Sequence, residues 1–240
     1  MKKAQTRKIR RSRRCPGFDR RGKLSMIQSP TRVKICGLTS PEAIKGAAQA
    51  GATYGGLVFY EKSPRHLDLA KAREVALAAP TGFAKVALVV NPQDAFLEEM
   101  LSQVPIDILQ LHGAEQPQRV QQIKQSTGLP IMKALGIATA QDLHEIDRYA
   151  EICDQLLIDA KPAPGAKLPG GNGLAFDWQL LENQTWKIPW MLAGGLTPDN
   201  VAQAIRVTQA RQIDVSSGVE STPGLKDMDK MRNFVAQARL

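Results

Sequence analysis

The sequence predicts an α/β protein that folds as a single (β/α)8, or TIM, barrel. Two consecutive apolar segments, residues 190–193 and 212–216, are typical of strands, and each runs into a turn of glycine and other small residues. Such a pair is typical of the phosphate site that the loops after strands 7 and 8 form in this barrel. The length of 240 residues also matches one barrel. Six more strands are therefore expected upstream.

The remaining sequence alternates between strand-like and helix-like segments. Strands are expected at residues 32–37, 54–60, 84–90, 106–112, 131–135 and 155–159. Helices are expected at residues 39–51, 68–79, 92–103, 116–126, 139–149, from 176 onward, 198–207 and 225–238. Strict alternation predicts a parallel sheet, and eight units are the number that closes a barrel. Residues 26–240 are thus expected to form one domain with eight outer helices, and its longest irregular loop spans residues 160–175.

The net charge of +9 arises from the first 25 residues. They contain eleven lysines and arginines against the single acid Asp19, which leaves a charge of −1 for residues 26–240. This basic extension could be an arm that binds nucleic acid or a membrane surface, a targeting segment, or residues upstream of a native start at Met26. We favour the start at Met26, because the rest of the chain does not use the extension's charge. Residues 1–25 are expected to be disordered for lack of apolar content.

Composition excludes several classes of protein. No apolar run reaches the roughly 18 residues that a membrane-spanning helix needs. The three cysteines, Cys15, Cys36 and Cys153, form no CxxC pair, which argues against a zinc site or a disulfide framework. No cluster of carboxylates and histidines calls for a metal. We expect a cytoplasmic protein without membrane or nucleic-acid partners for the barrel, either a monomer or a homodimer.

In this fold the catalytic residues lie at the carboxyl ends of the strands. Cys36 ends the first strand, where a thiol is either a small buried hydrophobe or, with its pKa lowered by Lys34 or by helix ends, a reactive group. Asp159 ends the sixth strand, where an unpaired carboxylate would be costly. It is therefore either functional or the structural partner of Lys34, Lys133 or Lys161.

Other polar residues near strand ends are weaker candidates. Asp214 could bind substrate hydroxyls or pair inside the barrel mouth. Arg65, after the second strand, suits recognition of a carboxylate but could equally be a solvated surface residue. His112 could act as a base or shape the site. Lys133 could form a Schiff base, although such a lysine is more often paired with an acid.

Several motifs in register resemble the phosphoribosylanthranilate isomerase family of tryptophan biosynthesis. They are Val33-Lys34-Ile35-Cys36-Gly37-Leu38-Thr39, Lys62-Ser63-Pro64-Arg65, Leu109-Gln110-Leu111-His112-Gly113, Gly170-Gly171-Asn172-Gly173 with Phe176-Asp177-Trp178, Ala193-Gly194-Gly195-Leu196-Thr197-Pro198-Asp199-Asn200-Val201, and Asp214-Val215-Ser216-Ser217-Gly218-Val219-Glu220. The resemblance runs in order from about residue 32 to the end. The chain departs from the family in a longer, proline-rich loop at residues 161–169, in Asn172, and in the basic extension.

The resemblance implies a role for each site residue. Cys36 aligns with the general base and Asp159 with the general acid of an Amadori rearrangement, which converts an aminoaldose to an aminoketose. Arg65 would face the anthranilate carboxylate, while His112 and Asp214 would lie near the substrate. The phosphate would sit on the two glycine-containing loops, which contain Gly194, Gly195, Ser217 and Gly218. The implied reaction needs no cofactor or metal, and the partner is a small phosphoribosyl substrate.

Two other functions remain open at this point. The histidine-pathway isomerase runs the same rearrangement on the same fold. Its site resembles a pair of carboxylates, with an acid in place of a thiol at the end of the first strand, so Cys36 argues against it. Epimerases of this fold need metal ligands that the sequence lacks. A nucleic-acid-binding role of residues 1–25 would instead show a steep dependence of affinity on salt.

Overall fold

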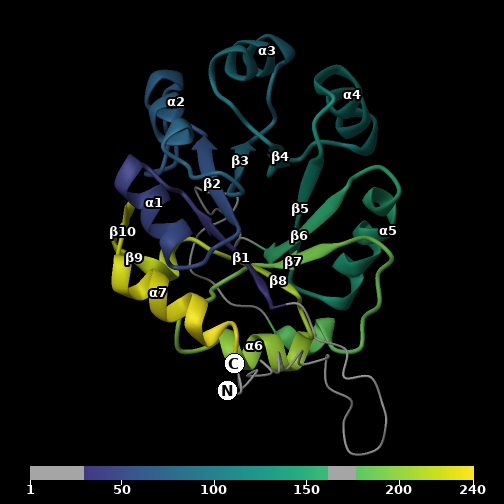
Figure 1. Ribbon diagram of the computed structural model, residues 1–240. Helices are drawn as coiled ribbons and strands as arrows, with labels where there is room; N and C mark the ends of the chain where they lie inside the picture. The colour runs from purple at the N-terminus through teal and green to yellow at the C-terminus, as the bar shows by residue number, and fades with distance from the viewer. Residues whose placement is uncertain (1–29, 162–176) are drawn as a thin grey trace, which may run out of the picture. The chain divides into compact units, whose positions relative to one another are not determined.

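Eight parallel strands form a closed barrel in the computed structural model, which describes residues 30–161 and 177–240. The order is sequential, and β1 closes the barrel by pairing with β8 (Figure 1). The barrel strands are β1 (Arg32–Cys36), β2 (Tyr54–Phe59), β3 (Ala84–Val89), β4 (Ile108–Leu111), β5 (Ile131–Ile137), β6 (Gln155–Ala160), β7 (Trp190–Leu192) and β8 (Gln212–Val215). The predicted fold class is confirmed.

Helices surround the strands (Figure 1). The α-helices are α1 (Pro41–Gln49), α2 (Leu69–Leu77), α3 (Asp94–Gln103), α4 (Pro117–Thr127), α5 (His144–Ala150), α6 (Val201–Thr208) and α7 (Met228–Gln237). Three short 3₁₀ helices are η1 (Ala140–Leu143), η2 (Trp178–Leu181) and η3 (Ser217–Val219). In the described part of the chain, η2 is the helical element between β6 and β7.

The stretch after β8 differs from the sequence prediction. Residues 225–238 were expected to be one helix, but β9 (Glu220–Thr222) and β10 (Leu225–Lys226) first form a two-stranded antiparallel ribbon. The helix α7 begins only at Met228, where the Asp227 side chain accepts hydrogen bonds from the N–H groups of Asp229 and Lys230. An N-cap at Asp227 explains why the helix starts later than expected.

Local signals set the boundaries of other helices. The Ser40 side chain accepts a hydrogen bond from Ala43 N and Pro41 occupies the first turn, so α1 begins where the sequence indicates. Asp68 caps α2 in the same way, through Lys71 N. The left-handed conformation of Gly128 ends α4. These caps place the helices directly after the loops that follow each strand.

Two apolar clusters fill the molecule. The larger lies between strands and helices and includes Ile35, Leu109 and Ile158. The smaller consists of residues at alternate strand positions, such as Met132, Leu157 and Met191, and fills the barrel interior. Nearer the carboxyl ends of the strands, polar side chains occupy inward-facing positions.

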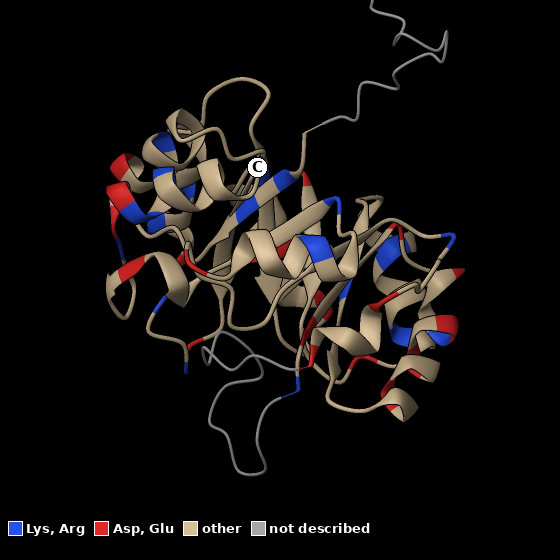
Figure 2. Ribbon diagram, turned by 90° about the horizontal axis from the view of Figure 1, so that it is seen from below, with Lys and Arg blue, Asp and Glu red and all other residues tan. Residues whose placement is uncertain are grey.

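Charged residues of both signs are interspersed over the outer helices (Figure 2), in keeping with the near-neutral charge of residues 26–240. None of the helices described is long and apolar enough to cross a membrane. The chain divides after Pro30, and the barrel belongs to residues 31–240. The predictions for residues 1–25, and for the loop at 160–175 beyond Lys161, lie outside the described residues.

A buried ion pair stabilises the loop after β4. Lys133 Nζ on β5 lies 2.9 Å from Glu115 Oε2, and both residues are almost fully buried. The same ammonium donates to the carbonyls of Leu111 and Gly113. Glu115 Oε1 in turn accepts from Asn91 N in the loop after β3. Lys133 is thus paired with an acid, as the more common fate of such a lysine predicts, and is not placed for a Schiff base.

Removing one partner of this pair should destabilise the barrel more than removing both. We expect Glu115→Leu to cost about 3–5 kcal/mol of unfolding free energy, because the Lys133 ammonium is left buried without its counter-charge. The double variant Glu115→Leu/Lys133→Met should be more stable than Glu115→Leu alone. Urea denaturation of the wild type, the single variants Glu115→Leu and Lys133→Met, and the double variant measures these losses. A double variant whose loss equals the sum of the two single losses would contradict this view of the pair.

Candidate active site

The carboxyl ends of the strands gather the predicted site residues at one mouth of the barrel. Side chains two positions apart leave the same face of a strand. Lys34 and Cys36 therefore share the inward face of β1. The same rule places Gln110 and His112 together at the end of β4, and it turns Asp159 on β6 and Asp214 on β8 inward.

Cys36 is buried against a glycine on the neighbouring strand. Cys36 is paired with Gly56 in the β1–β2 register. A Cβ atom at Gly56 would lie 2.8 Å from Cys36 Sγ and 3.1 Å from Lys34 Nζ. The thiol and the ammonium therefore occupy the same small space, and any larger residue at position 56 would displace them.

Burial dominates the ionisation of this thiol. Burial raises the pKa of Cys36 above its ordinary value, and the positive charge of Lys34 opposes that rise without overcoming it. In one of the two interpretations that the sequence left open for Cys36, Lys34 or helix ends would lower this pKa. That expectation was wrong, because the thiol is only 4 % exposed and the cost of desolvating a thiolate there exceeds the attraction of the ammonium.

Asp214 is the counter-ion of Lys34. Its Oδ1 accepts from Lys34 Nζ at 3.0 Å, across the β1–β8 closure. Burial alone would lower the pKa of Lys34, but its interactions with Asp214 and Cys36 together outweigh burial and raise it. The ammonium is therefore retained at neutral pH. One Asp214 oxygen is engaged by Lys34, so contact with a substrate hydroxyl would fall to the other.

Asp159 meets a histidine and not a lysine. Asp159 Oδ2 lies 3.5 Å from His112 Nε2, and Oδ1 accepts from Ala160 N at 2.8 Å. The other nitrogen of His112, Nδ1, lies 2.8 Å from Gln110 Nε2.

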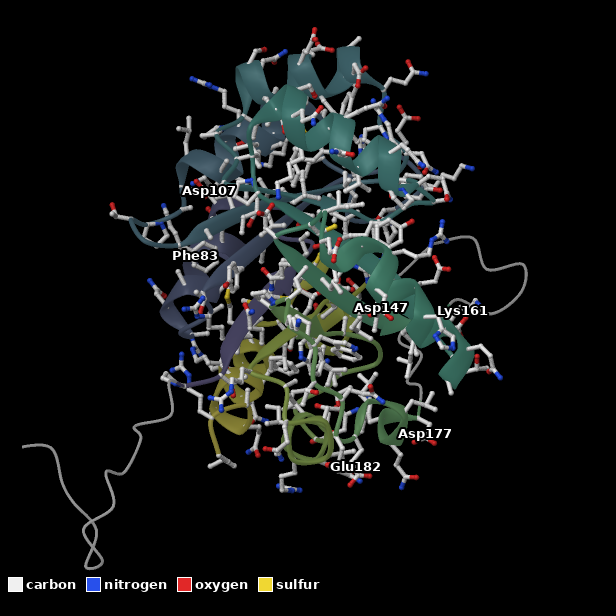
Figure 3. All side chains as sticks on the ribbon, turned by 90° about the vertical axis from the view of Figure 1, so that its right-hand side faces the viewer. Phe83, Asp107, Asp147, Lys161, Asp177 and Glu182 are labelled. Atoms are coloured by element: carbon white, nitrogen blue, oxygen red, sulfur yellow. The ribbon has the colours of Figure 1, made fainter. Side chains whose placement is uncertain are left out.

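The three lysines considered as structural partners of Asp159 all pair with other acids. Lys34 pairs with Asp214, Lys133 with Glu115, and Lys161 with Asp142 at 2.7 Å. Lys161 lies at the outside of the molecule (Figure 3). Within residues 30–161 and 177–240, an ion pair with a lysine therefore does not account for Asp159, and the functional interpretation stays a prediction.

Arg65 is buried and bound by a carboxylate of the chain itself. Its Nε and Nη2 donate to the two oxygens of Glu220, each at 2.8 Å. Lys226 Nζ reaches the same carboxylate at 2.6 Å. These cations hold the pKa of Glu220 below its usual value, although burial acts in the opposite direction. Arg65 is not a solvated surface residue, and three of its five N–H groups remain for another acceptor.

Sequence reasoning assigned no role to Glu220, Lys226 or Gln110. Glu220 and Gln110 stand inside motifs that carried the family resemblance, and that position was the available signal for them. Lys226 lay in a segment expected to be helix, so its burial at the site was not foreseen. The ribbon of β9 and β10 delivers both Glu220 and Lys226 to the barrel mouth.

Glycines allow the loops after β7 and β8 to approach the site closely. Gly194 and Gly195 both have positive φ, at 86° and 63°. A Cβ atom at Gly194 would lie 2.7 Å from Ala160 N and 3.2 Å from Asp159 Oδ1. One at Gly218, next to Ser217, would collide with the carbonyl of Leu196. The two loops thus pack on each other beside Asp159.

Among residues 30–161 and 177–240, no group of three or more histidine, cysteine, aspartate or glutamate side chains is placed to hold a metal ion. The site instead contains a buried thiol, a carboxylate beside an imidazole, and a guanidinium. Such a set can move protons between carbon and oxygen and can bind anions.

Removing the Lys34 charge should make Cys36 harder to ionise. We expect Lys34→Met to move the alkaline titration of Cys36 to higher pH, since the cation that opposes the effect of burial is lost and Asp214 is left unpaired. Thiolate absorbance near 240 nm, corrected with a Cys36→Ser chain, measures this in a Cys15→Ser background. The Cys36→Ser chain keeps Cys153, whose pKa burial raises to about 12, so the difference between the two chains isolates the titration of Cys36. A titration that stays in place or moves to lower pH would contradict this account.

The comparisons with known proteins agree on one family. The family model described as N-(5'phosphoribosyl)anthranilate (PRA) isomerase matches residues 33–237. The N-(5'-phosphoribosyl)anthranilate isomerase of Ruegeria sp. is 57 % identical over 209 residues, which cover 87 % of this chain and 97 % of that protein. That of Paracoccus denitrificans is 57 % identical over 206 residues, covering 86 % and 96 %.

Solved structures give the same result. The phosphoribosyl anthranilate isomerase of Thermotoga maritima superposes with a TM-score of 0.78 at 33 % identity, covering 87 % of this chain and 98 % of that one. A second structure of a phosphoribosyl anthranilate isomerase contains reduced 1-(o-carboxyphenylamino)-1-deoxyribulose 5-phosphate and superposes at 0.75 with 32 % identity, covering 87 % and 98 %. A third describes monomers generated from the dimeric Thermotoga maritima enzyme. By sequence and by structure, this chain therefore belongs to the phosphoribosylanthranilate isomerase family of tryptophan biosynthesis.

Proposed function

We propose that this chain converts N-(5-phosphoribosyl)anthranilate to its 1-deoxyribulose isomer with Cys36 as general base and Asp159 as general acid. Membership of this family makes the chain an isomerase that interconverts an aldose and a ketose. The observation that carries the residue assignment is the placement of a buried thiol and a buried carboxylate at the carboxyl ends of β1 and β6. Among the described residues, that carboxylate has no lysine partner. That end of the barrel is where this fold carries its chemistry.

The acid acts first in the proposed mechanism. Asp159 gives its proton to the furanose ring oxygen as the bond from that oxygen to C1′ breaks, and the anthranilate nitrogen lone pair forms a C1′–N double bond. The contacts of Asp159 with Ala160 N and His112 steady the carboxylate left behind.

The base acts second. The Cys36 thiolate takes the proton from C2′, and the electron pair of that bond forms the C1′–C2′ double bond while the nitrogen regains its lone pair. The resulting enol becomes the ketose when C1′ takes up a proton. The electrons thus stay within the substrate. Lys34 lies beside the thiol and favours its anionic form.

Anions at the two ends of the substrate would fix it across the barrel mouth. The phosphate would lie against the loops that contain Gly194, Gly195, Ser217 and Gly218. At Gly194 and Gly218 the neighbouring backbone comes so close that a Cβ atom would not fit. The carboxylate would take the N–H groups of Arg65 that Glu220 leaves over. His112 and Asp214 would face the ribose. Binding free energy from the two ends would hold the reacting carbon in position between the base and the acid.

Loss of either proposed proton-transfer group should abolish most of the turnover. We expect Cys36→Ser and Asp159→Asn each to lower kcat by about 10²–10⁴-fold, which is the usual contribution of general acid–base catalysis. The fluorescence decay of phosphoribosylanthranilate, followed with chelator present, measures the rate. Cys153→Ser is the matched control, because this second buried thiol lies before β6, at the opposite end of the strands, and should keep its activity. Near-normal kcat in either active-site variant would remove that residue from its role.

Arg65 should act on binding more than on chemistry. Arg65→Ala should raise the KM by about 10–100-fold, the value of a charge-assisted bidentate contact, while kcat falls less. Glu220→Gln should raise KM by a smaller factor, since the guanidinium remains but its orientation is no longer fixed by two charged oxygens. Titration with a carboxylate-bearing product analogue gives the affinities. An unchanged affinity in Arg65→Ala would show that the carboxylate binds elsewhere.

A further inference from the structure

Gln110 is a buried polar residue for which the proposed chemistry supplies no role. Its side chain has no exposure, and it lies on β4 two positions before His112. Gln110 Nε2 lies 2.8 Å from His112 Nδ1, whereas Gln110 Oε1 is buried without a hydrogen-bond partner in the described part of the chain. Burying an amide that is only partly satisfied costs free energy. Its single contact, with the ring of His112, therefore points to a role in positioning that ring.

The contact decides where the proton of His112 resides. An amide N–H that donates to Nδ1 requires that Nδ1 carry no proton, so the proton of the neutral ring is on Nε2. That nitrogen faces Asp159 Oδ2 at 3.5 Å. A charged imidazolium would instead set an N–H of the ring against the N–H of Gln110.

We propose that Gln110 is a positioning residue that holds His112 in the neutral Nε2–H tautomer, so that His112 directs its only ring proton at Asp159. This inference rests on the proposed role of Asp159 as general acid. A neutral donor stabilises the carboxylate after Asp159 has released its proton. A cation in the same place would remove the proton from Asp159 before the substrate arrived.

The other charged groups near His112 leave this arrangement undisturbed. From β5, Lys133 donates to the carbonyls of Leu111 and Gly113, which lie on either side of His112 in the chain. Glu115, from the loop after β4, neutralises that ammonium. The backbone that carries the ring is thus held from both sides by a pair without net charge. In the described part of the chain, Asp159 on β6 is the charged group that pairs with the ring itself.

The tautomer can be observed without any turnover. The full chain labelled with ¹⁵N-histidine would be studied by NMR at neutral pH, and His112→Asn would identify the His112 signals among the three histidines. We expect the shift of a protonated Nε2 and of an unprotonated Nδ1. A protonated Nδ1, whether in the other tautomer or in an imidazolium, would overturn the inference. Because this measurement uses the wild-type chain, it does not depend on a variant that folds.

An isosteric change at Gln110 tests the consequence for the reaction. In Gln110→Glu the carboxylate can only accept, so His112 should take a proton on Nδ1, and the NMR signal should show it. We expect kcat to fall by at least about tenfold with little change in KM, since position 110 orients a catalytic neighbour and is not expected to touch the substrate. Unchanged kcat in a chain whose Nδ1 has become protonated would overturn the inference.

Gln155→Glu is the matched control. Gln155 is likewise a buried glutamine on a barrel strand, but it begins β6 at the opposite end and donates to Gln212. The same added charge there should leave kcat and the His112 signals unchanged, and an equal loss of kcat in both variants would overturn the inference. Wild-type turnover with Nδ1 protonated would overturn the inference and leave the proposed function standing. The expected tautomer without turnover would overturn the proposed function and leave the assignment of Gln110 to His112 intact.

Discussion

Compensation of buried charge governs the mouth of this barrel. Lys34, Lys133 and Lys226 all have side chains that are almost fully buried, and each has a carboxylate oxygen within 3.0 Å. An ammonium without such a partner would cost several kcal/mol at these positions. These pairs close β1 on β8, hold the loop after β4, and fix the ribbon after β8.

The same constraint separates the surroundings of the proposed base from those of the proposed acid. Cys36 shares its space with a cation, which favours loss of a proton, although burial still raises its pKa. Asp159 faces an imidazole and a backbone N–H, and the nearby lysines are taken by other acids. The proposed base, which must take up a proton, and the proposed acid, which must give one up, therefore lie in one barrel mouth but in different electrostatic environments. The difference arises from the charged and polar neighbours of each group.

Periodicity and strand-end logic predicted much of this structure from sequence. The eight strands followed from apolar segments bounded by turns, and Cys36, Asp159 and Asp214 were placed by their positions at strand ends. The partners of these residues could not be predicted, because Lys34 and Asp214 are 180 positions apart and Arg65 and Glu220 are 155 apart. The late start of α7 was missed for a local reason, since the turn before Asp227 forms a ribbon that the helical pattern concealed.

Closure of β1 on β8 also has a consequence for synthesis of the protein. The strand that carries Cys36 is synthesised well before its neighbour β8 and the ribbon that holds Arg65. Until then Lys34 has no counter-ion and β1 presents an open edge. The barrel therefore cannot close, and Lys34 cannot be buried with its counter-ion, until residues 212–215 have been synthesised.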